Sequence, residues 1–263
     1  MLKELFNISG FPYLSQGATP SVKEKISTLL KVYGLIFLSL LLVGPLIYMA
    51  DNFVIHVIHA KSIKQQNDVS FQHLIQKIGY GVAWLYICLI GPILEETVFR
   101  LPLSFKRWHI ALSISVAIFL FGSVLPPAKA LAHSVGLGYA FLIRLVFVLV
   151  LYFIIKKLLP VNLSVRPAYK KVFITVSICL FGLIHISNYA PLQWQLIWIY
   201  PIYVLPQIIM GWGLTYIRFK NGFIWGIALH CLINSVAMAL SYADKMPVAP
   251  VKVRPAHVVM KKV

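Results

Sequence analysis

Residues 79–105 read GYGVAWLYICLIGPILEETVFRLPLSF, an apolar run that contains two adjacent carboxylates and an arginine. About 20 apolar residues in a helix cross a bilayer core about 30 Å thick, so this run predicts a transmembrane helix. The chain has only seven Asp and Glu residues, and two of them, Glu95 and Glu96, lie here. Each costs about 2.5–3.5 kcal/mol at the bilayer centre. Because intramembrane ionisable side chains are rare and costly, this cluster indicates a functional site.

The composition indicates a polytopic membrane protein embedded in a lipid bilayer. Of the 263 residues, 60% are hydrophobic and only 12% are charged, and the mean hydropathy is +0.84. A soluble domain of this length needs more polar surface. The net charge of +17 does not indicate nucleic-acid binding, because the 24 Lys and Arg residues lie mostly between apolar runs. That pattern is typical of basic residues retained on the cytoplasmic side of a membrane.

The apolar runs predict an all-α fold, a bundle of about seven transmembrane helices, with eight as the alternative. The seven expected spans are 30–50, 79–105, 108–126, 134–155, 170–189, 195–217 and 222–242. We expect residues 1–29 to form a cytoplasmic N-terminal segment ahead of a transmembrane domain at 30–242. Residues 243–263 hold three prolines and five basic residues, which predicts a disordered basic tail.

The basic residues between the spans predict the orientation. With the N-terminus inside, the inner side holds thirteen of them: Lys3, Lys23, Lys25, Lys31, Lys106, Arg107, Lys156, Lys157, Arg166, Lys170, Lys171, Arg218 and Lys220. The outer loops hold four: Lys61, Lys64, Lys77 and Lys129. Because basic loops stay on the cytoplasmic side, we expect an integral protein of the inner (cytoplasmic) membrane with a cytoplasmic N-terminus. The basic tail then lies outside, against the rule, unless one span is miscounted.

Helical spacing assigns different surroundings to the three charged residues. Glu96 and Arg100 are four residues apart, so they share a helix face and can pair. Glu95 is rotated by about 100° from Glu96 and points elsewhere. We therefore expect Glu96 and Arg100 to brace the helix while Glu95 projects into a polar cavity. The alternative is a buried ion network of purely structural role. Gly91-Pro92 is expected to loosen the helix one turn before Glu95.

Two later spans carry further pairs at helical spacing, an aromatic ring with an imidazole in Phe181 and His185, and an imidazole with a carboxamide in His230 and Asn234. A lone histidine in an apolar helix is more often a core residue than a catalyst. Without water, however, buried polar groups are satisfied most cheaply by one another. Helix rise places Glu95, His185, His230 and Asn234 at depths of roughly 15, 21, 12 and 18 Å from the inner surface. One cavity can therefore hold all four.

Such a cavity suits amide hydrolysis. A carboxylate and a histidine can orient water and remove its proton, and a second imidazole and the Asn234 carboxamide can donate hydrogen bonds to the oxyanion. Attack by water is preferred, because no serine or cysteine lies in an evident nucleophile motif with these groups. We expect no cofactor and no metal. Zinc is the alternative, since one Glu and two His resemble a zinc ligand set, although no H-E-x-x-H occurs.

The motifs Glu95-Glu96-x-x-x-Arg100, Phe181-x-x-x-His185 and His230-x-x-x-Asn234, in this order, resemble those of the CAAX-protease and bacteriocin-processing (CPBP/Abi) superfamily of intramembrane endopeptidases. The resemblance covers about residues 79–242. It implies that Glu95 and His185 activate water, that His230 and Asn234 form the oxyanion hole, and that Glu96, Arg100 and Phe181 give structural support. It also implies a peptide or membrane-protein substrate.

One departure is that Glu95 and His185 are ninety residues apart, which leaves room for two extra helices, the spans 108–126 and 134–155. Arg144 lies in the second of them. A bound substrate carboxylate is one role for Arg144, and a buried pair or an interfacial position is the more common one. The function we predict is an intramembrane endopeptidase. The alternatives are a non-catalytic immunity, scaffold or secretion-accessory protein of the same fold and, with less support, a proton-coupled transporter.

Overall fold

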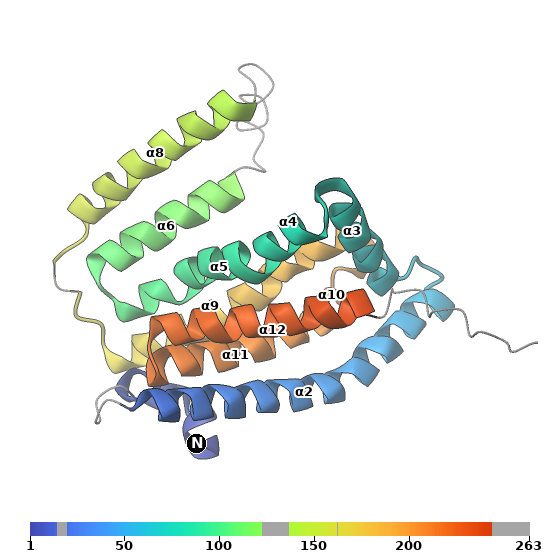
Figure 1. The fold of residues 1–263 in the computed structure, drawn as a ribbon, viewed down its shortest axis with the longest axis horizontal. Coiled ribbons are helices and arrows are strands. Elements are labelled where there is room, and N and C mark those ends of the chain that lie inside the picture. The colour runs from blue at the N-terminus through green and yellow to red at the C-terminus, as the bar shows by residue number, and fades with distance from the viewer. Residues whose placement is uncertain (15–19, 123–136, 162, 244–263) are drawn as a thin grey trace, which may run out of the picture.

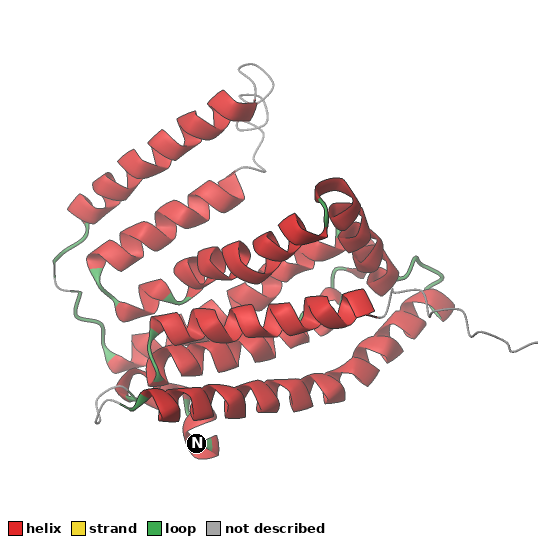
Figure 2. Cartoon of the chain, viewed as in Figure 1, coloured by secondary structure: helices red, strands yellow, loops and turns green. Residues whose placement is uncertain are grey.

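The fold is that of a computed structural model, which describes residues 1–14, 20–122, 137–161 and 163–243. Every regular element of these residues is helical (Figure 2), which confirms the all-α prediction. Of the expected tail at 243–263, only the first residue is described. Residues 123–126 of the expected span 108–126 and residues 134–136 of the expected span 134–155 also lie outside the described residues.

Five helical segments of the described residues are long and apolar enough to cross a membrane. They are Val22–His56 (α2), Tyr80–Phe99 (α4, η2 and α5), Gly138–Leu158 in α8 (Leu137–Leu158), Pro167–Tyr189, and Phe223–Ser241 in α12 (Phe223–Ala243). The fourth consists of α9 (Pro167–Ile184) and the 3-10 turn η5 (His185–Tyr189). These five correspond to five of the seven expected spans.

The other two expected spans are shorter helices. The span at 195–217 is interrupted: it comprises η6 (Trp194–Leu196), α10 (Tyr200–Tyr203) and α11 (Leu205–Lys220). Pro201 and Pro206 each occupy the first turn of a new helix, where a missing N–H costs no helical hydrogen bond. The span at 108–126 contains α6 (Arg107–Phe121), whose 15 residues rise about 22 Å.

Helix α2 begins eight residues before the expected start of the first span. Ser21 Oγ accepts a hydrogen bond from the backbone N–H of Glu24, and the Glu24 carboxylate accepts one from the N–H of Ser21 at 2.7 Å. This capping box satisfies two free donors of the first turn and fixes the start of the helix. The helix has 35 residues and a length of about 52 Å, more than a bilayer core requires.

The N-terminal segment packs against the bundle through α1 (Leu2–Leu5) and η1 (Ile8–Tyr13). The Phe11 ring is fully buried and contacts the rings of Trp212, Tyr216 and Phe219. The Trp212 indole donates a hydrogen bond to the Leu5 carbonyl oxygen at 2.6 Å. The segment is therefore attached to α11 by aromatic packing.

A buried aspartate joins three elements at the other end of α2. Asp51 accepts hydrogen bonds from the Ser62 hydroxyl, the backbone N–H groups of Ile63 and Lys64, and the Tyr203 hydroxyl. It thereby caps α3 (Ile63–Ile78) and connects it to α10. With its acceptors satisfied, this carboxylate is a structural residue.

The two extra helices lie together at one edge of the bundle, with α8 packed on α6 (Figure 1). The Arg144 guanidinium donates a hydrogen bond to the carbonyl oxygen of Phe119 and lies 4.9 Å from the centroid of that ring. Arg144, which is half-buried, therefore connects α8 to α6.

Candidate active site

Glu95 and Glu96 follow an irregular turn in the second membrane helix. Residues 86–90 form the π-helical turn η2, and α5 (Gly91–Phe99) begins directly after it. A Cβ atom at Gly91 would lie 3.0 Å from the carbonyl oxygen of Tyr86, so glycine permits this close approach. Such π turns occur frequently at functional sites. The structure therefore has a backbone irregularity at the position where the sequence predicts one.

Glu96 is fully buried and bridges two cationic or protonatable groups. Its Oε1 atom lies 3.1 Å from an Arg100 guanidinium nitrogen and 3.0 Å from His230 Nδ1. The Arg100 pairing is the one that the four-residue spacing predicts. The contact with His230, on α12, is an interaction that the sequence analysis missed.

Arg100 is held between an aromatic ring and a helix backbone. Its guanidinium carbon lies 3.8 Å from the centroid of the Phe181 ring, and one nitrogen lies 3.4 Å from the Gly211 carbonyl oxygen. A Cβ atom at Gly211 would approach that nitrogen to 3.1 Å. Phe181 therefore supports the buried cation through its π face, and Gly211 leaves room for it.

Glu95 lies between two imidazoles. Its Oε2 atom is 3.8 Å from His185 Nε2 and 3.8 Å from His230 Nε2, and the side chain is 31% exposed, whereas Glu96 is 0% exposed. These separations exceed those of direct hydrogen bonds. They leave Glu95 Oε2, which is buried, without a hydrogen-bond partner among the described residues, and a water about 2.8 Å from each of two polar atoms would supply one. The two adjacent glutamates therefore have distinct surroundings, as the helical geometry predicts.

The hydrogen-bond partners assign the protons of both imidazole rings. His185 Nδ1 lies 2.6 Å from the Phe181 carbonyl oxygen, which can only accept, so Nδ1 carries the proton. His230 Nδ1 faces the Glu96 carboxylate and carries a proton for the same reason. In the neutral rings, both Nε2 atoms are therefore acceptors directed toward Glu95.

Asn234 lies one turn after His230 on α12, against the π turn. Its amide nitrogen donates a hydrogen bond to the Ile87 carbonyl oxygen at 2.9 Å. In a π turn each carbonyl oxygen accepts from the N–H five residues later, which for Ile87 is Pro92 and carries no hydrogen, so the Asn234 amide supplies the missing donor. One N–H of Asn234 remains for another acceptor. The π turn itself gives no signal in the sequence beyond Gly91-Pro92.

The described residues contain no group of three or more His, Cys, Asp or Glu side chains that could hold a metal ion. The residue types of a zinc ligand set, one Glu and two His, do occur together in Glu95, His185 and His230. The Glu95 carboxylate oxygen lies 3.8 Å from the Nε2 atom of each histidine. Chemistry without a metal stays a prediction.

Residues 153–236 match a family model described as type II CAAX prenyl endopeptidase Rce1-like. The matched region includes the second and third motifs, with His185, His230 and Asn234, and begins after Glu95. This match confirms the resemblance that the motifs indicate. No curated protein and no solved structure matches the chain. With five apolar helices in its described part, the chain is an integral membrane protein, and its residues 153–236 are similar to type II CAAX prenyl endopeptidases.

Proposed function

We propose that this protein is an intramembrane endopeptidase that hydrolyses a peptide bond of a membrane-associated peptide or protein. The observation that carries the proposal is the position of Glu95 Oε2, 3.8 Å from the Nε2 atoms of both His185 and His230. Glu95 is thus a carboxylate beside His185 Nε2, an acceptor in the neutral ring, while the neighbouring carboxylate is neutralised by Arg100. The name of the matched family makes a prenylated C-terminal peptide the first substrate to test.

In the first step, a water held by Glu95 and His185 attacks the carbonyl carbon of the substrate. Its two hydrogens point to Glu95 Oε2 and to His185 Nε2, the acceptor nitrogen of the neutral ring. Glu95 takes one proton as the new C–O bond forms, and the carbonyl electron pair moves to the oxygen. The result is a tetrahedral oxyanion.

The oxyanion then requires hydrogen-bond donors, which we assign to His230 and Asn234. Asn234 supplies its remaining N–H. Because His230 Nδ1 already donates to Glu96, its Nε2 can donate only when the ring is an imidazolium.

In the second step, the intermediate collapses and the C–N bond breaks. The proton held by Glu95 passes to the leaving amine, and the other product is a carboxylic acid that ionises. Each proton comes from the attacking water or returns to its donor, so the step needs no further reactant. Glu95 thus acts first as a base and then as an acid.

The test uses the full-length protein in nanodiscs with two sets of fluorogenic substrates, prenylated C-terminal peptides and unlipidated transmembrane peptides. We expect cleavage in at least one set. Replacing His185 by Ala should lower the rate by roughly 10²- to 10⁴-fold, because a water-activating group is lost. The matched control is His109→Gln, which changes a histidine that contacts Ser104 outside the site and should leave the rate within about threefold.

Two results would contradict the proposal. Retention of full activity by a folded His185→Ala protein would exclude the Glu95–His185 pair as the water-activating group. Absence of cleavage by the wild-type protein in both substrate sets would favour the non-catalytic alternative, an immunity, scaffold or secretion-accessory protein of the same fold.

A further inference from the structure

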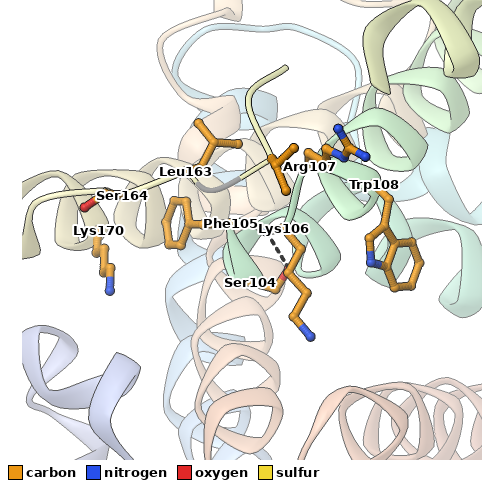
Figure 3. A pocket seen from close by; sticks show the side chains of 9 residues that line it. Ser104, Phe105, Lys106, Arg107, Trp108, Leu163, Ser164 and Lys170 are labelled. Atoms are coloured by element: carbon orange, nitrogen blue, oxygen red, sulfur yellow. Dashed lines mark hydrogen bonds between the residues drawn. The ribbon is translucent and has the colours of Figure 1, made fainter. Parts of the chain in front are cut away.

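A cavity of about 590 Å³ opens at the end of the bundle where the chain turns from α5 into α6 (Figure 3). Its walls come from two segments far apart in sequence, the turn after η3 (Leu101–Ser104) and the connection between α8 and α9. The lining residues are Ser104, Phe105, Lys106, Arg107, Trp108, Val161, Leu163, Ser164 and Lys170. None of them belongs to the proposed active site.

The turn at Phe105 shapes this cavity. Phe105 has a left-handed backbone with φ of 56°, a conformation that is uncommon for an aromatic residue and is often found where a function requires it. Its ring packs edge-on against Phe173 of α9, with 5.8 Å between centroids. In Figure 3, Lys106 and Lys170 lie on either side of this ring and extend in the same direction.

The cations of the cavity have no carboxylate partner among the residues that the structure describes. Within the described part of the chain, Lys106, Arg107 and Lys170 form no ion pair with a carboxylate; the lysine or arginine pairs there are Glu96 with Arg100 and Glu4 with Lys220. Helices α6 and α9 also begin at this end without side-chain caps, which adds a smaller positive potential. The cavity therefore attracts an anion from its surroundings.

The position of the cavity favours an anion at the membrane surface. At the left of Figure 1 lie the starts of α2, α6 and α9 and the ends of α8 and α11, and these ends carry half of the 24 Lys and Arg residues. Trp108 is 45% exposed, as is common for tryptophans at headgroup depth. Val161 and Leu163 add apolar wall, which a lipid glycerol or acyl region can contact.

We propose that this cavity binds the phosphate headgroup of an anionic phospholipid. Lys106, Arg107 and Lys170 would neutralise the phosphate, Ser164 would offer a hydroxyl donor, and Trp108 would lie at the headgroup level. Basic pockets between membrane helices are known to hold anionic headgroups. The proposal is independent of the peptidase activity, since it uses no residue of the candidate active site.

Native mass spectrometry of the full-length protein in detergent tests this proposal. It compares phosphatidylglycerol with phosphatidylcholine of the same acyl chains, and we expect phosphatidylglycerol to bind at least about tenfold more tightly. The double variant Lys106→Gln/Arg107→Gln should weaken phosphatidylglycerol binding by roughly 10- to 30-fold. The control pair, Lys156→Gln/Lys157→Gln, removes two cations at the end of α8 outside the cavity and should change binding by less than about threefold.

Three results would overturn the assignment. The first is equal affinity for the two lipids, and the second is an equal loss in the pocket and control variants. The third is complete displacement of phosphatidylglycerol by millimolar inorganic phosphate, which would make the cavity a site for free phosphate. Lys170→Gln, on a different helix, provides a second variant if the double variant does not fold. A wild-type affinity in Lys170→Gln would likewise contradict the proposal.

Discussion

At the scale of single residues, the two adjacent glutamates show how helical rotation separates chemical roles. Glu96 is completely buried and contacts Arg100 and His230, while Glu95 keeps a third of its surface exposed beside two Nε2 atoms. A buried carboxylate that is paired with a guanidinium and hydrogen-bonded to an imidazole is held in place and neutralised. A partly open one can contact water and substrate. Glu95 is therefore the better candidate for proton transfer.

Asn234→Ala should lower the cleavage rate by about 100- to 1000-fold, because one oxyanion donor is removed. The same change leaves the Ile87 carbonyl oxygen without its 2.9 Å hydrogen bond, so a small loss of thermal stability should accompany it. Single-turnover kinetics and melting curves separate the two effects. Asn221→Ala is the matched control, since its amide binds the Lys25 carbonyl oxygen elsewhere. An unchanged rate in Asn234→Ala would remove this residue from the site.

At the scale of elements, hydropathy located the cores of the long helices but not their ends. The first span was expected at 30–50, yet α2 begins at Val22, because the capping box of Ser21 and Glu24 starts a helix in a polar stretch. A window of apolar residues does not detect such a cap. Hydropathy also failed to detect a helix boundary inside the apolar run 195–217, where Pro206 begins a new helix.

Gly91→Ala tests the role of the π turn. The added Cβ would lie 3.0 Å from the Tyr86 carbonyl oxygen, so the backbone before Glu95 must shift. A displacement of about 1 Å in a catalytic group can cost up to about 10²-fold in rate, and we expect a loss of about 10- to 100-fold in the cleavage assay. Gly81→Ala is the control, because no atom lies within 4 Å of its added Cβ. Equal rates in the two variants would show that the π turn does not position Glu95.

At the scale of the whole molecule, the site depends on contacts that one helix cannot reveal. The spacing of Glu96 and Arg100 predicts their pair, because both lie on α5 or directly after it. The bond between Glu96 and His230 joins residues 134 positions apart, and it requires α5 and α12 to pack together. The helix rise predicts similar depths in the membrane for residues of α5 and α12, but it does not determine which faces of the two helices contact each other. Only the packed structure gives that information.

The attachment of the N-terminal segment to α11 should depend on pH. The hydrogen bond from Lys220, at 3.1 Å, is the largest effect on the pKa of Glu4 and lowers it from its usual 4.5. Partial burial raises this pKa, and the hydrogen bond from the Tyr216 hydroxyl lowers it further, so the net shift is downward. The docked segment therefore binds fewer protons than the released one. Its stabilisation is present above pH 4.5 and is lost as the pH falls through the lowered pKa.

Hydrogen exchange of residues 1–14, corrected for intrinsic rates, measures this release. Protection should decrease on acidification below pH 4.5 in the wild-type protein and should show much weaker pH dependence in Glu4→Gln. The expected effect is less than about 1 kcal/mol, because the ion pair is partly exposed. The same pH dependence in both proteins would show that another group controls the attachment.

The most direct test of the account is the cleavage rate of Glu95→Gln in nanodiscs. The account predicts a loss of roughly 10²- to 10⁴-fold, because the amide cannot accept the proton of the attacking water, with a melting temperature close to that of the wild type. Glu4→Gln, which changes a carboxylate outside the site, should keep the wild-type rate. A folded Glu95→Gln protein that cleaves as fast as the wild type would contradict the central claim.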